Sequence, residues 1–127
     1  MKKIISVLIS LAAFFLIACS GSDTYLGKWK ATNANGDKFD LEFSAKKFSV
    51  KDSSGQIKKY EYKQHSIHID NSIKTYGIKL EDGRAYDIHF PKENDDNIAL
   101  IRDEQGQPLY TLSRKDYIKY ESVYKLE

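Results

Sequence analysis

From Tyr25 onward, apolar residues alternate with polar ones, and turn-forming residues interrupt the alternation about every 8 to 12 residues. Alternate side chains of a β-strand point to the same face, so a period of two predicts strands. The strongest hairpin signal is Asn35-Gly36, which separates the alternation around Trp29 from that around Leu41. Pro91 ends another alternating run, because proline cannot donate to a strand ladder. The pattern therefore predicts an all-β fold.

The alternating segments predict eight or nine short antiparallel strands joined by short loops. They lie at Tyr25 to Ala31, Phe39 to Phe43, Phe48 to Val50, Tyr60 to Tyr62, Ile67 to Ile69, Tyr76 to Leu80, Tyr86 to Phe90, Ile98 to Arg102 and Leu109 to Ser113. This division places turns near Gln64 and at Asp70-Asn71-Ser72. A meander that closes on itself has no exposed sheet edge, so we expect a small antiparallel meander barrel.

The C-terminal tail has a different pattern. Tyr117, Tyr120 and Tyr124 fall at i, i+3 and i+7 behind Ser113-Arg114-Lys115-Asp116, which has the form of a capping box. This spacing predicts a short C-terminal helix. The alternative is a final strand through Tyr117-Ile118-Lys119-Tyr120.

The composition fits one small domain of 127 residues and excludes several classes of function. Lys2 and Lys3 are the charged residues of the first 18, so the rest of the chain carries 18 basic and 18 acidic groups. This balance argues against a nucleic-acid partner, which requires clustered positive charge. The sequence contains no phosphate loop, His-Glu-x-x-His or Gly-x-Ser-x-Gly motif, so we expect a protein that is not an enzyme and needs no cofactor.

Residues 1–18 have the form of a secretory signal peptide, with two lysines followed by an apolar stretch from Ile4 to Ala18. At about 1.5 Å per residue this stretch cannot cross a hydrocarbon layer about 30 Å thick. Its end, Leu16-Ile17-Ala18-Cys19, closely resembles the lipobox of bacterial lipoproteins. The resemblance implies that Cys19 becomes the mature N-terminus and carries lipid chains that anchor the protein to a membrane. The alternative is a secreted protein with a free thiol at Cys19.

Three regions follow from this interpretation: a lipoprotein signal peptide at 1–18, a lipidated tether at 19–24 and the barrel domain at 25–127. Ser20 follows the cysteine and resembles the residue of outer-membrane-directed lipoproteins in enteric-type bacteria, where Asp favours the inner membrane. The tether reaches less than about 20 Å, so we expect the domain close to the outer membrane. Because Cys19 is the one cysteine, its lipidation leaves no thiol for a disulfide, a redox pair or a sulfur-ligated zinc site.

Two segments near the ends of the domain resemble lipocalins. Tyr25-Leu26-Gly27-Lys28-Trp29 is similar to the Gly-x-Trp signature of their first strand, and Leu109-Tyr110-Thr111-Leu112-Ser113-Arg114 looks like the last strand of bacterial outer-membrane lipocalins. The resemblance implies that Gly27, Trp29 and Arg114 close one end of the barrel, with the guanidinium across the indole. The chain departs from the family in its short domain and in lacking the middle motif. The alternative is a core tryptophan and a solvated arginine.

Four tyrosines, Tyr60, Tyr62, Tyr76 and Tyr86, fall on the predicted inward faces of strands. Since phenol groups need hydrogen-bond partners, they either line a ligand cavity or fill a narrow barrel. The pairs Lys46-Lys47, Lys58-Lys59 and Asp95-Asp96 are interpreted as solvated charges that discourage strand addition. His65 and His68 lie an odd number of residues apart in a predicted strand, hence on opposite faces, so no metal site is expected.

Two functions are compatible with these features. The first is a membrane-anchored, non-catalytic lipocalin-like protein that binds a small apolar or amphipathic ligand. The second is a lipoprotein whose loops bind a protein, inhibiting or neutralising an envelope-directed enzyme or toxin. An apolar cavity of about 300 Å³ or more favours the first, and a packed interior beneath an exposed aromatic patch favours the second.

Overall fold

The structure, a computed structural model, describes residues 22–123. The predictions for the signal peptide, for Cys19 and for Tyr124 lie outside the described residues.

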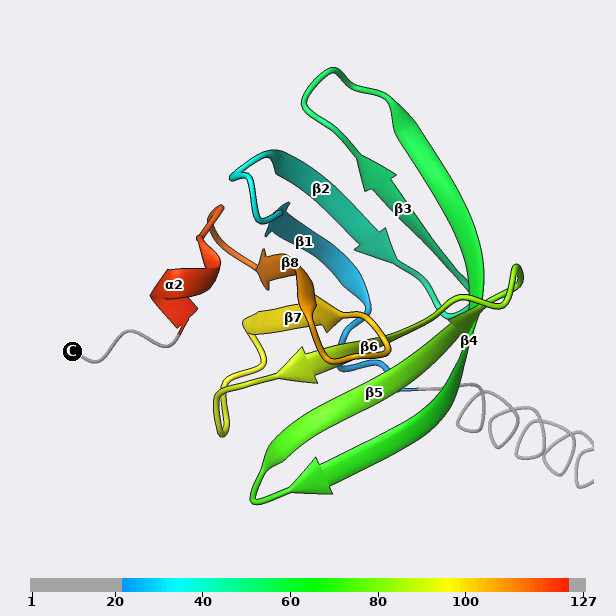
Figure 1. Ribbon diagram of the computed structural model, residues 1–127, viewed down its shortest axis with the longest axis vertical. Coiled ribbons are helices and arrows are strands. Elements are labelled where there is room, and N and C mark those ends of the chain that lie inside the picture. Colours follow the sequence, from blue (N-terminus) through cyan, green and yellow to red (C-terminus); the bar gives the residue numbers. More distant parts are fainter. Residues whose placement is uncertain (1–21, 124–127) are drawn as a thin grey trace, which may run out of the picture.

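Eight antiparallel strands form a closed barrel in which every strand pairs with its neighbours in sequence (Figure 1). They are β1 (Gly27–Thr32), β2 (Lys38–Phe43), β3 (Lys47–Lys51), β4 (Ile57–Asp70), β5 (Ile73–Leu80), β6 (Ala85–Phe90), β7 (Ile98–Arg102) and β8 (Pro108–Ser113). The last strand returns to the first, with Ala31 opposite Leu112, and this pairing closes the barrel. The predicted all-β meander barrel is confirmed.

One predicted turn is absent. The segments around Tyr60 and Ile67 belong to a single strand, β4, of 14 residues. Its register with β5 shifts between Gln64 and Ser66, so the break in alternation marks a β-bulge rather than a turn. The next predicted turn is present: Asn71 and Ser72 both have positive φ angles, of 51° and 66°, as a tight two-residue hairpin turn requires.

Aromatic side chains pack the interior of the barrel toward one of its ends. The ring centres of Trp29 and Phe90 lie 6.1 Å apart, and those of Tyr25 and Tyr76 lie 5.4 Å apart. The ring of Phe43 on β2 stacks on that of Phe48 on β3. Tilted and stacked ring pairs at these distances stabilise a core beyond the area they bury. The inward positions predicted from the alternation therefore form one connected hydrophobic core.

The C-terminal tail covers part of the outside of the barrel. A short helix, α2 (Tyr120–Val123), is present as predicted, but it begins later than the capping-box pattern suggests. The reason is that Ser113 completes β8, and its hydroxyl accepts the backbone N–H groups of the next turn. The Thr32 hydroxyl donates to the carbonyl of Ile118, and Val123 is buried, so the tail packs against the seam between β1 and β8. None of the helices in residues 22–123 has the length and hydropathy needed to cross a membrane.

Candidate functional site: a sealed end and an open cavity

One end of the barrel is sealed by Trp29 and Arg114. The indole is 1% exposed, and the guanidinium carbon lies 3.6 Å from the centroid of its ring. Arg114 also donates to the carbonyl of Lys28 at 2.9 Å and to that of Thr24 at 3.1 Å. The structure thus brings the two predicted residues together. A stacked arginine that also makes charge-assisted hydrogen bonds contributes both dispersion and electrostatic stabilisation.

Gly27 leaves room for this stack. A Cβ atom at this position would lie 3.3 Å from Nη1 of Arg114, and the backbone φ of 97° disfavours any other residue. The glycine of the first-strand motif therefore has a steric and a conformational role beside the arginine.

The N-terminal segment before β1 fills the rest of this end. The Trp29 indole N–H donates to the carbonyl of Tyr25, and the Tyr25 hydroxyl donates to Oε1 of Gln64 at 2.8 Å. The Tyr76 hydroxyl donates to Oγ1 of Thr24 at 3.1 Å. These bonds satisfy polar groups that would otherwise be buried without partners, and they fix the segment across the barrel end.

The four predicted tyrosines divide between the two ends. Tyr62 and Tyr76 are buried toward the sealed end, where Tyr62 donates to the carbonyl of Ser44 and Tyr76 to Thr24. Tyr60 and Tyr86 line a cavity at the opposite end. The structure therefore does not bring all four into one site.

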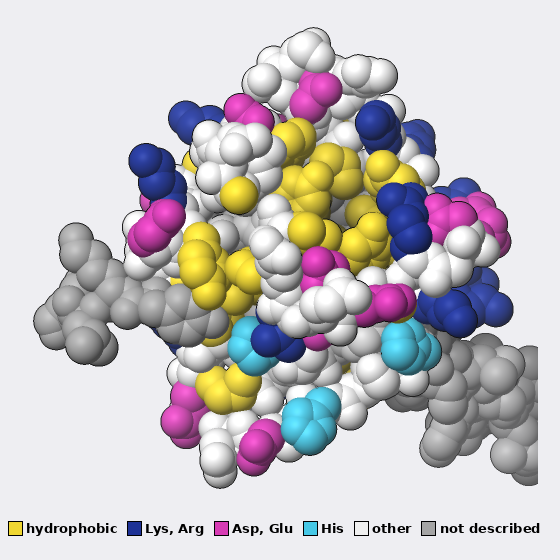
Figure 2. All heavy atoms as spheres, viewed as in Figure 1, with side chains coloured by type: hydrophobic (Ala, Val, Ile, Leu, Met, Phe, Trp, Pro, Cys, Tyr) yellow, Lys and Arg dark blue, Asp and Glu magenta, His cyan; other side chains and the backbone are white. Residues whose placement is uncertain are grey.

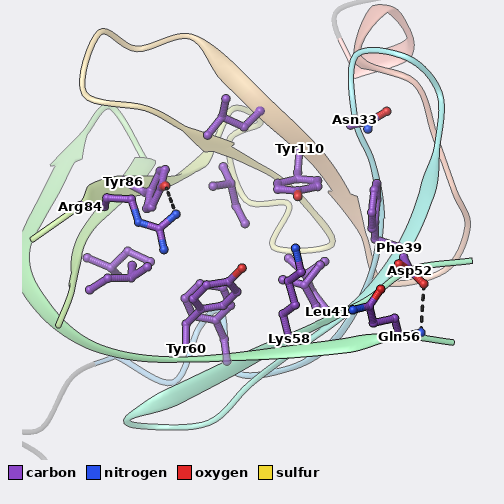
Figure 3. Close-up of a pocket in the computed structure, with 16 residues that line it drawn as sticks. Asn33, Phe39, Leu41, Asp52, Gln56, Lys58, Tyr60, Arg84, Tyr86 and Tyr110 are labelled. Carbon is purple, nitrogen blue, oxygen red and sulfur yellow. Dashed lines mark hydrogen bonds between the residues drawn. The ribbon is translucent and has the colours of Figure 1, made fainter. Parts of the chain in front are cut away.

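The cavity has a volume of about 360 Å³ and is formed by inward side chains of the strands where they approach their turns (Figure 3). Its wall is mostly apolar and includes Phe39, Leu41, Val50, Ile78, Ile101 and Leu109. Figure 2 looks onto the open end of the barrel, where hydrophobic side chains gather around a hollow in the upper half of the view. An apolar cavity with few polar groups is the usual form of a small-molecule site.

Tyrosine hydroxyls and one arginine supply polar groups in the cavity lining. Nη1 of Arg84 lies 3.4 Å from the Tyr86 hydroxyl, and the guanidinium lies 5.5 Å from the centre of the Tyr60 ring. Asp82 forms an ion pair with Arg84 at 2.8 Å and so fixes its orientation. Burial raises the pKa of Tyr110, and the neighbouring phenols add to this effect, so its hydroxyl stays neutral and can donate a hydrogen bond to a ligand.

Lys58 is a second cation in the lining, and it is exposed although it lies on the inward face of its strand. It pairs with Val50 of β3 and lies two residues before Tyr60, so it shares their face. Figure 3 shows its side chain extending into the cavity. Among residues 22–123 its ammonium group has no ion-pair partner. The one carboxylate among the lining residues, Asp52, accepts hydrogen bonds from Ser54 and from backbone N–H groups of its own turn, which lowers its pKa.

Three turns at the open end of the barrel have the same hydrogen-bond pattern. Asn33, Asp52 and Asp103 each accept two backbone N–H bonds across their own turns, at 2.9 to 3.0 Å. In each turn a glycine follows three residues later with positive φ: Gly36, Gly55 and Gly106. These side-chain-stabilised turns make the mouth a fixed opening rather than a set of loose loops.

The histidines do not gather into a metal site. His89 shares a hydrogen bond with Thr75 at 2.8 Å, and burial lowers the pKa of its imidazole. Asp87, its neighbour on the same strand face, pairs with Arg102 through two hydrogen bonds of 2.8 and 3.0 Å. Within the described part of the chain no three His, Cys, Asp or Glu side chains are placed to hold a metal ion together.

Sequence reasoning missed Lys58, Arg84 and Tyr110 as cavity residues. The signal for Lys58 was available, since it lies at an even offset from Tyr60 and Tyr62 in the same alternating segment. Its charge favoured the interpretation as a solvated residue, whereas its long side chain can line the mouth while keeping its amine in water.

No protein-family model matches the chain, and a search of curated proteins finds no match to it.

Removal of the Arg114 side chain is expected to open the sealed end. Arg114→Ala loses the stack on Trp29 and two charge-assisted hydrogen bonds, so the free energy of unfolding should fall by about 2 to 4 kcal/mol. Urea unfolding followed by the fluorescence of Trp29, the one tryptophan, measures this loss. Arg114→Lys should recover part of it, and Lys115→Ala, at the exposed neighbouring cation, should change it little. Equal stability of all three variants would contradict the sealing role.

The buried phenols predict a loss of stability at high pH. Burial raises the pKa of Tyr62 and, to a smaller extent, of Tyr25 above the ordinary value of 10. The folded state therefore keeps protons that the unfolded state releases, so the free energy of unfolding is constant below about pH 10 and falls above it. Tyr62→Phe should reduce this slope by up to about 1.4 kcal/mol per pH unit. Urea unfolding between pH 8 and about pH 11 tests it, and an unchanged slope would count against the burial argument.

Proposed function

We propose that this protein is a membrane-anchored, non-catalytic, lipocalin-like binding protein that holds a small amphipathic ligand in the open end of its barrel. The observation that carries the proposal is the largely apolar cavity of about 360 Å³, bounded by ordered turns and lined by the cation Lys58. Its volume lies at the lower end of the range for small-molecule sites, so the ligand is a single short chain or a small ring system.

The polar groups of the cavity favour a ligand with an anionic end. Lys58 offers a positive charge without an ion-pair partner among the described residues, and Tyr60, Tyr86 and Tyr110 offer hydroxyls in the same lining. A carboxylate or sulfonate would satisfy the ammonium group, while the apolar remainder of the ligand would displace water from the wall. Arg84 adds a second cation at the rim, although Asp82 already pairs with it.

The alternative function, in which the loops bind an envelope protein, would be favoured by a packed interior under an exposed aromatic patch. The hollow interior at the open end supports the ligand proposal instead. Native mass spectrometry of the protein purified from its own envelope separates the two, because a bound small mass supports the ligand proposal and a stoichiometric protein partner supports the alternative.

Lys58 and Lys59 provide a matched pair for testing the anionic end, since they are adjacent on β4 and face opposite sides of the sheet. Decanoate and decanol share one chain and differ in charge, and native mass spectrometry gives the fraction of protein that binds each. We expect Lys58→Ala to weaken decanoate binding about tenfold, as loss of one charge-assisted hydrogen bond predicts, with little effect on decanol. Lys59→Ala should leave both unchanged. Equal losses for both probes in Lys58→Ala would refute the anionic preference.

The anchor is tested at Cys19. Cys19→Ser should abolish the incorporation of radiolabelled palmitate, because the thioether that carries the lipid requires the thiol. Ser20→Ala keeps the thiol and is the control, so it should incorporate the label as the unmodified chain does. Labelling of Cys19→Ser at the normal level would show that the lipobox interpretation is wrong.

A further inference from the structure

Two isoleucines of β4 are exposed although they continue the inward face of the strand. Ile67 and Ile69 are 55% and 59% exposed, the largest values among the big hydrophobic side chains of residues 22–123. They pair with Tyr76 and Lys74 of β5, so Ile67 shares the face of the buried Tyr76. Exposed apolar side chains that lie together on one face usually mark a surface that contacts something apolar.

The exposure arises because the end of the β4–β5 hairpin extends past the rest of the barrel (Figure 1). On the other side of β4, β3 pairs only as far as Glu61, and one further bond joins the N–H of Tyr62 to the carbonyl of Lys46. From there to Asp70 the strand pairs with β5 alone. No described strand therefore lies opposite Ile67 and Ile69 to cover them.

The part of the β4–β5 hairpin that no third strand pairs with begins next to the point where the N-terminal segment contacts the barrel. The backbone N–H of Ser22 donates to Oε1 of Gln64 at 2.9 Å, and Gln64 lies three residues before Ile67. Cys19 lies three residues before Ser22, so an extended chain places it at most about 11 Å away. A lipid on Cys19 would hold the membrane surface beside the hairpin rather than beside the cavity mouth.

We infer that the β4–β5 hairpin inserts Ile67 and Ile69 into the interfacial layer of the bilayer that holds Cys19. The inference rests on the lipid anchor of the proposed function and adds a second, side-chain contact to it. Insertion is shallow, because the unpaired edge of β4 carries backbone groups that must stay hydrated. The lipid chains on Cys19 would supply the attachment, and two isoleucines buried beside them would add apolar contact and fix the orientation of the barrel.

The surface next to the hairpin suits an anionic bilayer. A groove beside Gln64 is lined by Lys46, Lys47, Lys63 and Lys79 against two carboxylates, Glu61 and Glu81, which leaves an excess of positive charge. Lys63 and Lys79 are direct cross-strand partners, an arrangement of like charges that a negative counter-surface would relieve. Lysines at this position would contact phosphate headgroups as the isoleucines enter the layer below them.

The test uses tryptophan as a depth probe in the full mature protein, reconstituted in vesicles of phosphatidylethanolamine and phosphatidylglycerol whose acyl chains carry bromine. Ile69→Trp reports on the hairpin. Ile57→Trp is the matched control, because Ile57 lies on the same strand, is 52% exposed and sits at the cavity end. Emission of the unmodified protein, which comes from the buried Trp29, is subtracted. We expect the bromine to quench Ile69→Trp at least about threefold more than Ile57→Trp.

The outcomes separate the hairpin from the anchor. Mass spectrometry of the same samples shows whether Cys19 carries lipid. A lipidated protein whose Ile69→Trp is quenched no more than Ile57→Trp overturns the inference and leaves the anchor standing. An unlipidated protein whose Ile69→Trp is still quenched on added vesicles overturns the anchor and keeps the hairpin contact, and absence of both overturns both. Burial of Ile69→Trp in a dimer, seen by sedimentation without vesicles, would also overturn the inference.

Discussion

The contact between Arg114 and Trp29 is the constraint on which the rest of the barrel depends. The two residues come from opposite ends of the domain sequence, and the arginine also holds the carbonyls of Thr24 and Lys28. One side chain therefore joins the segment before β1, the start of β1 and the end of β8. Pairing of β1 with β8 is the last step that closes a meander, and it rests on few paired residues, so a stack at this seam stabilises the closure itself.

The seal explains why the two ends of the barrel differ. At the Trp29 end the phenols of Tyr25, Tyr62 and Tyr76 find partners in the chain itself, in Gln64, Ser44 and Thr24. At the other end Tyr60, Tyr86 and Tyr110 reach a cavity, and the turns around it are held by their own aspartate and asparagine side chains. A short barrel can keep a cavity only if its core is concentrated elsewhere, and the aromatic cluster behind Trp29 supplies that core.

Most of the fold and about half of the candidate site can be predicted from the sequence. Strand alternation is a local property, so it located the strands and the Asn71-Ser72 turn without reference to tertiary structure. The sequence predicts a turn at Gln64 where the structure has a bulge, because both interrupt the alternation and only the pairing with β5 tells them apart. The depth of a side chain along the barrel axis is also invisible to a period of two. Tyr60 and Tyr62 have the same pattern, yet one lines the cavity and the other supports the sealed end. The charge of Lys58 predicts a solvated side chain, and the residue is exposed, but its inward register also places it in the cavity lining.

The position of the tether relative to the cavity restricts how a ligand could arrive. β1 runs from the sealed end, where Ser22 contacts Gln64, to Asn33 at the rim of the cavity, so tether and mouth lie at opposite ends of the barrel. If Cys19 holds the membrane and Ile67 and Ile69 enter it, the mouth opens into the aqueous phase. The ligand must then cross water, which disfavours a long-chain lipid and favours a short amphipathic molecule with a charged end. That requirement agrees with the small volume of the cavity and with the cation of Lys58 in its lining.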